Sequence, residues 1–332
     1  MLSRGFDHGE VVRNKLFKEK MEIVLLLLSL VILYFGAEGL VSGAASLAKR
    51  MGVSPLVIGL TVVSLGTSAP ELVVSVKAAL NGQSALSIGN VLGSNFFNVG
   101  LILGFSALIY PLSVKRQLLK LDVPVMIVSA LMFFVMFLDS EISRIEALIF
   151  VLTLISYITY MLVTSKKNSA GKQNEKEEDI PLSKHWLLDI LFVGVGLAAL
   201  IYGSDMLVVN AVVIAERLGM SEAMIGLTIV AAGTSMPELA TSVVAAIKKR
   251  SDIAIGNVVG SNIFNMLLIL GITGLIRPIS TPDINYVDSL FNIGIGLLLW
   301  VFMKRSTRIT RSQGAVFLAV YLLYFFYKLI LV

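Results

Sequence analysis

Residues 57–111 read VIGLTVVSLGTSAPELVVSVKAALNGQSALSIGNVLGSNFFNVGLILGFSALIYP, and residues 224–278 read MIGLTIVAAGTSMPELATSVVAAIKKRSDIAIGNVVGSNIFNMLLILGITGLIRP. The two stretches align without a gap at an offset of 167 residues, and 32 of the 55 positions are identical. The correspondence continues upstream, where FGAEGLV at 35–41 matches YGSDMLV at 202–208. A repeat of this length predicts two copies of one structural unit.

The composition of the 332 residues is that of a membrane protein, with 56% hydrophobic residues, 15% charged residues and a mean hydropathy of +0.87. Soluble domains contain about 45–50% apolar and about 25% charged residues, so the composition excludes a soluble globular enzyme. Disorder is excluded because nearly every segment has apolar surface to bury. Apolar stretches of roughly 17–25 residues, enough to cross a bilayer, recur along the chain. The ten predicted spans are 23–48, 55–80, 85–110, 121–138, 145–165, 186–215, 222–247, 253–276, 287–303 and 313–332.

Several chemistries are excluded by residue types that the chain lacks. The sequence has no cysteine, which excludes disulfides, thiolate metal sites and cysteine nucleophiles. His8 and His185 are the only histidines, which argues against a transition-metal site built from imidazoles. Basic runs interleaved with aromatic residues are missing, so we expect no nucleic-acid partner. No nucleophile–base pair is apparent either, so we expect no enzyme activity. We also expect no cofactor, and no obligate protein partner is evident besides the lipid bilayer.

The charged residues divide the chain and orient it. The only long polar linker, SKKNSAGKQNEKEEDIPLSKH, covers residues 165–185. If both termini are outside, cytoplasmic loops hold 17 lysines and arginines against eight outside, five of which lie in the N-terminal tail. This asymmetry favours outside termini and a cytoplasmic linker in the cell membrane. The predicted parts are a polar, poorly ordered tail (1–20), repeat 1 (21–165), the linker (166–185) and repeat 2 (186–332).

Each copy contains five spans, and five is odd, so the second copy has the opposite orientation in the membrane. The loop charges agree: the hairpin after the second span reads NGQS at 81–84, whereas its counterpart reads KKRSD at 248–252. Inverted repeats are typical of secondary transporters, whose binding site lies at mid-membrane between the copies. The sequence therefore predicts an all-α membrane protein with ten transmembrane helices in two inverted five-helix repeats.

Identity between the copies is highest at polar residues inside the spans. GTSAPE (66–71) and GTSMPE (233–238) place threonine, serine and glutamate on one helix face, and each proline frees backbone oxygens in the preceding turn. GNVLGSNFFN (89–98) and GNVVGSNIFN (256–265) add a serine and an asparagine four residues apart. All donor atoms are oxygens, and calcium takes 6–8 oxygen ligands at about 2.3–2.6 Å. The candidate ligands are Thr67, Ser68, Glu71, Ser94, Asn98, Thr234, Ser235, Glu238, Ser261 and Asn265.

Structural roles remain open for part of this set. The two glutamates could be a protonated hydrogen-bonded pair, although a carboxyl group at mid-membrane is usually functional. The serines and asparagines of the second motif could join helices instead of binding ions. The outer asparagines fit packing better than ligation; these are Asn90, Asn95, Asn257 and Asn262. The matched pair Glu38 and Asp205, on the first and sixth spans, fits a structural role and an ion path equally well.

At these motifs, and over all ten spans, the sequence resembles the calcium/cation antiporter superfamily, specifically its sodium/calcium exchanger branch. The resemblance implies a group of ion sites formed by the second, third, seventh and eighth helices. It implies that Glu71 and Glu238 bind calcium together with the Thr67 and Thr234 carbonyls. Sodium ligands are implied at Ser68 with Ser94 and at Ser235 with Ser261, completed by the Ser64 and Ala231 carbonyls, with Asn98 and Asn265 lining the middle position. Some prokaryotic relatives have an aspartate at the position of Asn265, so this chain lacks one titratable group there.

We therefore predict a secondary antiporter that exchanges calcium for sodium by alternating access, with the two ions competing for overlapping oxygens. The glycine-bearing first and sixth spans supply no GTS ligand and are expected to move across a fixed site. Calcium/proton exchange on the same two glutamates is the alternative, although proton-coupled relatives usually have a GN-x-x-E type motif. A cation channel is another alternative, which the inverted repeat disfavours. An intramembrane hydrolase is a third, since paired carboxylates could hydrolyse a substrate, but no nucleophile–base pair is apparent.

Overall fold

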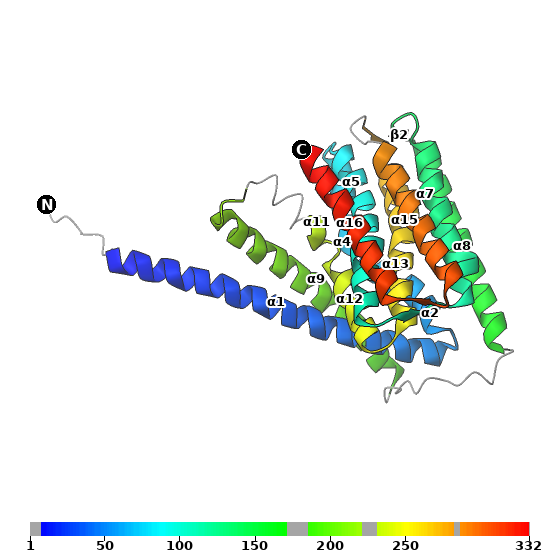
Figure 1. Ribbon diagram of the computed structural model, residues 1–332, viewed down its shortest axis with the longest axis horizontal. Coiled ribbons are helices and arrows are strands. Elements are labelled where there is room, and N and C mark those ends of the chain that lie inside the picture. The colour runs from blue at the N-terminus through cyan, green and yellow to red at the C-terminus, as the bar shows by residue number, and fades with distance from the viewer. Residues whose placement is uncertain (1–7, 171–184, 221–230, 282–285, 332) are drawn as a thin grey trace.

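The computed structural model describes residues 8–170, 185–220, 231–281 and 286–331 of the chain. Two long helices, α1 (His8–Met51) and α9 (Trp186–Arg217), lie side by side and run obliquely across the other helices (Figure 1). Their backbones are close, because a Cβ atom added to Gly196 of α9 would lie 2.7 Å from the Leu40 nitrogen of α1. The remaining helices stand side by side as a bundle (Figure 1).

The bundle contains the other segments of both repeats, including several short π-helical segments (η). In repeat 1 these are α2 (Pro55–Ile58), η1 (Gly59–Val63), α3 (Ser64–Thr67), α4 (Ala69–Leu80), α5 (Ser84–Phe96), η2 (Phe97–Leu103), α6 (Gly104–Ile109), η3 (Leu118–Asp122), α7 (Val123–Met136) and α8 (Arg144–Ala170). In repeat 2 they are α11 (Ala231–Gly233), α12 (Met236–Ile247), α13 (Ser251–Phe264), η5 (Asn265–Ile269), α14 (Leu270–Ile276), α15 (Tyr286–Arg305) and α16 (Arg311–Leu331).

The helices confirm the prediction of a helical membrane protein. Within the described ranges, seven helices are long and apolar enough to cross a membrane, and an eighth span results if the bent pair Pro55–Thr67 and Ala69–Leu80 is one unit. The seventh predicted span is represented by α11 and α12, and its first part, 222–230, lies outside the described residues. The tenth corresponds to α16, which has 21 residues. The count of ten spans in two inverted repeats stays a prediction.

Short strands that the sequence did not predict join the two repeats. β1 (Leu112–Ser113) pairs antiparallel with β4 (Arg308–Ile309), and β2 (Glu141–Ile142) pairs with β3 (Ile279–Ser280). At the offset of 167 residues, β1 corresponds to β3 and β2 corresponds to β4, so exchanging the copies turns one pairing into the other. Two copies related by a twofold rotation have this property.

The second span bends where its motif predicts a break. The two halves meet at Ser68, whose backbone angles are φ −82° and ψ 6°. The helix axis bends by 45° between the two halves. Pro70 in the first turn of α4 has no N–H and clashes with the carbonyl four residues back, at Gly66. Ser235 has nearly the same conformation at the start of α12, with φ −91° and ψ 8°. Both breaks therefore place a glutamate in the first turn of a new helix, Glu71 in α4 and Glu238 in α12.

The tail and the linker differ in extent from their predicted boundaries. The tail is helical from His8 onwards, because its glutamates, lysines, arginine and leucine favour helix and no proline interrupts them. At the linker, α8 continues to Ala170, and residues 171–184 lie outside the described part of the chain.

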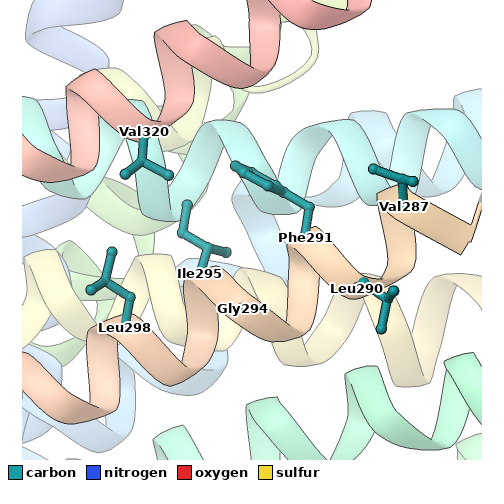
Figure 2. A pocket seen from close by; sticks show the side chains of 7 residues that line it. All are labelled: Val287, Leu290, Phe291, Gly294, Ile295, Leu298 and Val320. Carbon is teal, nitrogen blue, oxygen red and sulfur yellow. The ribbon is translucent and has the colours of Figure 1, made fainter.

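An apolar pocket of about 390 Å³ opens between α15 and α16, lined by Phe291, Ile295 and Leu298 among others and by Val320 from the facing helix (Figure 2). The side chains that line it carry no oxygen or nitrogen, so the pocket offers no ligand to a cation. The polar residues of the motifs lie elsewhere, on the helices around the two breaks.

Candidate ion-binding site

The two glutamates lie where the helix breaks of the repeats face each other, and both side chains are completely buried. Each accepts a hydrogen bond from the GTS serine of the opposite repeat. Ser68 Oγ donates to Glu238 Oε1 at 2.9 Å, and Ser235 Oγ donates to Glu71 Oε1 at 3.0 Å. The two bonds are equivalent under the repeat offset, so the site is shared between the copies.

The serines of α5 and α13 approach the same two carboxylate oxygens. Ser94 Oγ lies 3.5 Å from Glu71 Oε1, and Ser261 Oγ lies 3.4 Å from Glu238 Oε1. Around each Oε1 atom the structure therefore groups one serine from each repeat. The resemblance implied pairs of serines from the same repeat, Ser68 with Ser94 and Ser235 with Ser261. In the structure each pair at a glutamate oxygen comes from both repeats, and the glutamates are central in either arrangement.

The second oxygen of each carboxylate is buried and has no hydrogen-bond partner within the described part of the chain. A buried acceptor left unpaired costs about 1–3 kcal/mol, and more when it is charged. A cation between the repeats would remove this cost. The unpaired oxygens on the four motif segments are Glu71 Oε2, Glu238 Oε2, Thr234 Oγ1, Asn98 Oδ1 and Asn265 Oδ1.

Two of these oxygens belong to asparagine side chains whose amide nitrogens are hydrogen-bonded to other asparagines. The four asparagines involved lie on α5, η2, α13 and η5. Asn98 Nδ2 donates to Asn262 Oδ1, and Asn265 Nδ2 donates to Asn95 Oδ1, each at 3.0 Å. The nitrogen of each inner amide is thus held by an outer asparagine of the other repeat, and its oxygen is left for a ligand. The sequence favours packing for Asn95 and Asn262 and does not predict these hydrogen bonds to the inner amides. Their identity in both copies was the available signal.

The other two outer asparagines hold helices together within a repeat. Asn90 Nδ2 donates to Ser75 Oγ at 2.9 Å and to the Glu71 carbonyl at 3.2 Å. Asn257 Nδ2 makes the equivalent bonds to Ser242 Oγ at 3.0 Å and to the glutamate carbonyl of its own repeat at 3.3 Å. These contacts fix the first turn of α4 on α5 and the first turn of α12 on α13, which agrees with a packing role.

The threonines and the backbone oxygens differ between the copies. Thr67 Oγ1 donates to Asn257 Oδ1 at 3.1 Å and to the Ser64 carbonyl at 3.3 Å, whereas Thr234 Oγ1 has no partner among the described residues. The Ser64 carbonyl also accepts the Ser68 N–H at 3.0 Å. Two bonds occupy its two lone pairs, which leaves the Ser64 carbonyl less available to an ion than the resemblance implied.

In repeat 2 the backbone carbonyl that the proline leaves without a helical hydrogen bond accepts one from a serine side chain. Ser204 Oγ of α9 donates to the Gly233 carbonyl at 2.6 Å, and Gly233 stands four residues before Pro237. Ala231 begins the same short helix, α11, so its carbonyl lies on the segment that leads into the site. A side chain of α9 therefore reaches the helix break that carries Thr234 and Ser235.

The donor set suits a hard cation. Within the described residues no group of three or more histidine, cysteine, aspartate or glutamate side chains is placed to hold a metal ion. The site instead combines two carboxylates with neutral hydroxyl and amide oxygens, as calcium prefers. Two carboxylates neutralise one divalent ion, and subsets of the same oxygens suit smaller monovalent ions.

The chain is similar to known proteins over almost its whole length. Residues 21–163 and 188–330 both match the family described as sodium/calcium exchanger protein. The sodium/calcium exchanger MaX1 of Methanosarcina acetivorans is 36% identical over 345 residues, covering 91% of this chain and 96% of the relative. The inner membrane protein YrbG of Escherichia coli is 33% identical over 299 residues, covering 87% and 91%. A structure of the sodium-calcium exchanger NCX_Mj, soaked with Na⁺ and Ca²⁺, superposes with a TM-score of 0.79 at 31% identity, covering 91% of this chain and 97% of that one.

Proposed function

Because the chain belongs to the sodium/calcium exchanger family, a family of antiporters and not of enzymes, we propose that it exchanges calcium for sodium across the cell membrane. The observation that carries the proposal is the pair of buried glutamates, each bonded by a serine of the other repeat and each with one unpaired oxygen. Since these oxygens lie between the two copies, we place the ion sites at mid-membrane. The proposed exchange uses no cofactor.

The proposal includes the topology. Ten helices form two inverted repeats, 21–165 and 186–332, with both termini outside and with residues 166–185 in the cytoplasm. The two strand pairs support this arrangement, because the repeat offset converts the β1–β4 pair into the β3–β2 pair. The distribution of lysine and arginine among the loops supports it as well.

Calcium and sodium use overlapping oxygens in the proposed mechanism. Glu71 and Glu238 supply the negative charge for calcium, together with the Thr67 and Thr234 carbonyls and the amide oxygens of Asn98 and Asn265. Sodium ions take the serine hydroxyls on either side of the glutamates. Since a glutamate cannot serve both ions fully at once, binding of one ion disfavours the other. Movement of α1 and α9 across the site then changes the side to which it opens.

A gradient experiment in proteoliposomes tests the coupling ion. We expect an outward sodium gradient to drive uptake of radiolabelled calcium with net movement of charge, and a pH gradient alone to drive none. The reason is the hydroxyl-rich surrounding of each carboxylate, which suits a dehydrated metal ion and which a proton does not need. If a proton ionophore abolishes uptake and sodium has no effect, the protein is a calcium/proton exchanger that uses the same glutamates. Uptake that needs no countergradient would indicate a channel.

Removing one serine hydroxyl tests the division of ligands between the two ions. Ser68→Ala or Ser235→Ala deletes one neutral oxygen, and we expect sodium binding to weaken more than calcium binding. An under-coordinated ion loses about 1–3 kcal/mol, by analogy with an unmade buried hydrogen bond, which is roughly 5- to 150-fold in affinity. The measurements are calcium binding without sodium and its inhibition by sodium. Equal weakening of both ions would argue for one shared site without separate sodium sites.

The outer asparagines give a test of positioning. Asn95→Leu and Asn262→Leu keep approximate volume but remove the acceptor that holds the inner amide of the other repeat. We expect calcium affinity to fall roughly 10- to 100-fold, as it does when an outer partner of a metal ligand is lost. Ser129→Ala serves as the control, because this buried hydroxyl lies outside the motifs and donates to the Met126 carbonyl of its own helix. Unchanged calcium affinity in both asparagine variants would return these residues to a packing role.

A further inference from the structure

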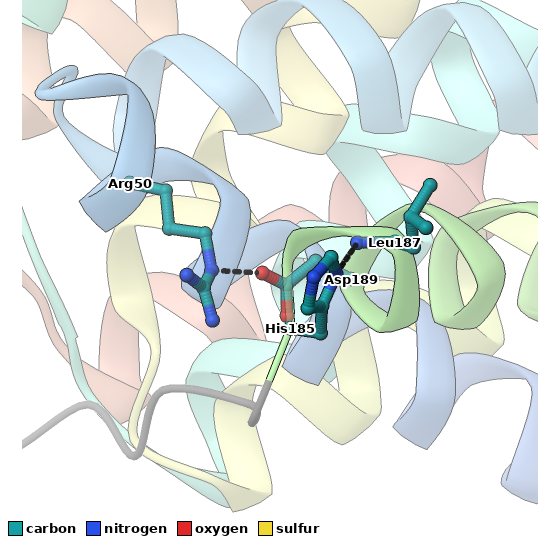
Figure 3. A network of polar contacts seen from close by, with 4 residues as sticks. All are labelled: Arg50, His185, Leu187 and Asp189. Carbon is teal, nitrogen blue, oxygen red and sulfur yellow. Dashed lines mark hydrogen bonds and ion pairs between the residues drawn. The ribbon is translucent and has the colours of Figure 1, made fainter.

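Ion pairs fasten α1 and α9 to each other at both ends. Arg50 Nε of α1 contacts Asp189 Oδ2 of α9 at 2.6 Å (Figure 3). At the other end, Arg217 of α9 makes two contacts of 2.5 Å with the carboxylate of Glu22 in α1. Under the repeat offset Arg50 corresponds to Arg217 and Glu22 corresponds to Asp189, so the two ion pairs are equivalent. The helices therefore form one unit, called here the α1–α9 pair.

A lysine of the bundle forms an ion pair with α1 at one end of the α1–α9 pair, and the equivalent position at the other end carries no charge. Lys248, directly after α12, places its Nζ 2.9 Å from Glu38 Oε1 and 3.1 Å from Ser42 Oγ, both on α1. The positions equivalent to Lys248 and Ser42 are Asn81 and Val209, which offer neither a cation nor a hydroxyl.

The packing of the pair follows the same asymmetry. α1 packs along α12, whereas α9 has no contact of similar extent with α4 among the described residues. Towards its C-terminal end, α9 diverges from the bundle (Figure 1). Asp205, the counterpart of Glu38, is exposed. In the proposed topology the end with the Lys248–Glu38 ion pair is cytoplasmic, and the end that carries Asn81 in place of Lys248 is extracellular.

We propose that Lys248, Glu38 and Ser42 form a latch that holds the α1–α9 pair against the cytoplasmic end of the bundle and so favours the state open to the outside. The inference rests on the proposed function, because a latch has an effect only if the pair moves between two positions. Glu38 and Lys248 are partly exposed, with 38% and 30% of their side-chain surfaces accessible. For an ion pair of this exposure, loss of the contact shifts the ratio of the two states roughly two- to fivefold.

The absence of cysteine allows a direct measurement of the two positions. Leu80 at the end of α4 and Val209 on α9 are 56% and 55% exposed and correspond to Ile247 and Ser42 at the latched end. Spin labels on Leu80→Cys and Val209→Cys therefore report whether α9 has closed on α4. In nanodiscs, we expect mostly the long distance in the parent protein. Lys248→Gln and Glu38→Gln should each raise the population with the short distance about two- to fivefold.

Matched variants separate the latch from unspecific destabilisation. Asp205→Asn removes the equivalent carboxylate without touching the latch, so it should leave the distance distribution unchanged. Exchanging the charges in Lys248→Glu with Glu38→Lys should restore the parent distribution, and Asn81→Lys should favour the short distance by pairing with Asp205. A distance that responds to sodium and calcium but not to Lys248→Gln or Glu38→Gln would overturn the latch alone. A single distance under all ion conditions would overturn alternating access and the latch with it.

Discussion

We expect Glu71→Gln and Glu238→Gln each to abolish calcium uptake into proteoliposomes while the protein stays folded and monodisperse. Glutamine keeps the shape of the side chain and still accepts the serine hydrogen bond through its Oε1 atom. A divalent ion then meets one carboxylate instead of two. Unit charges about 4 Å apart interact by about 4 kcal/mol at an effective dielectric constant of ~20. The lost carboxylate therefore weakens calcium binding roughly a thousandfold.

The measurements are calcium uptake, calorimetric calcium binding and size-exclusion chromatography on each variant. Glu146→Gln is the control, since this carboxylate caps the start of α8 through Ser143 and lies outside the motifs. Near-normal uptake by both glutamine variants would remove the two glutamates from the ion site. Loss of monodispersity would instead assign them a structural role.

We expect Gly260→Val to prevent formation of a stable protein. Gly260 lies on α13 where this helix crosses the second span, and an added Cβ atom would lie 2.5 Å from Ser64 Oγ and 2.9 Å from Leu60 Cα. Since one of these contacts is with backbone, the two helices must separate. Overpacking of a close contact costs about 1–3 kcal/mol, and a branched side chain against backbone is at the upper end of that range or beyond it. The same separation would pull Glu238 and Ser68 apart.

Thermal unfolding in detergent and the yield of monodisperse protein measure this effect. Gly294→Val is the matched control, because no described atom lies within 4 Å of the Cβ position on this α15 glycine, which lines the apolar pocket. Equal behaviour of the two variants would show that the crossing of α13 and the second span tolerates expansion.

The sequence predicted the helical membrane fold because each span is long and apolar, and because the repeat reveals itself at a constant offset. It also predicted the four segments around the glutamates, since oxygen donors recur there in both copies. It did not predict which partners meet. Periodicity shows that Ser68 and Glu71 share a helix face, but only the crossing of the repeats brings Ser68 to Glu238.

Two further features lay beyond the reach of sequence patterns. The motifs separate the inner asparagines from the outer ones, but they do not show that Asn95 and Asn262 accept hydrogen bonds from the inner amides of the opposite repeat. The strand pairs are two residues long, which is too short for an alternation of polar and apolar residues to be recognised.

The cross-repeat contacts also bear on how such a chain arises from a smaller ancestor. The two-residue strands pair only with strands of the other copy, and each site glutamate accepts its shortest side-chain hydrogen bond from the other copy. One repeat on its own leaves the strands unpaired and leaves each glutamate only the longer contact with the serine of its own repeat, Ser94 or Ser261. Under the proposed inverted topology, a half-length ancestor would need a second copy, inserted in the opposite direction, to supply these contacts. In that topology, joining two such copies in one chain allows each half to fix its own direction of insertion through the lysines and arginines of its loops.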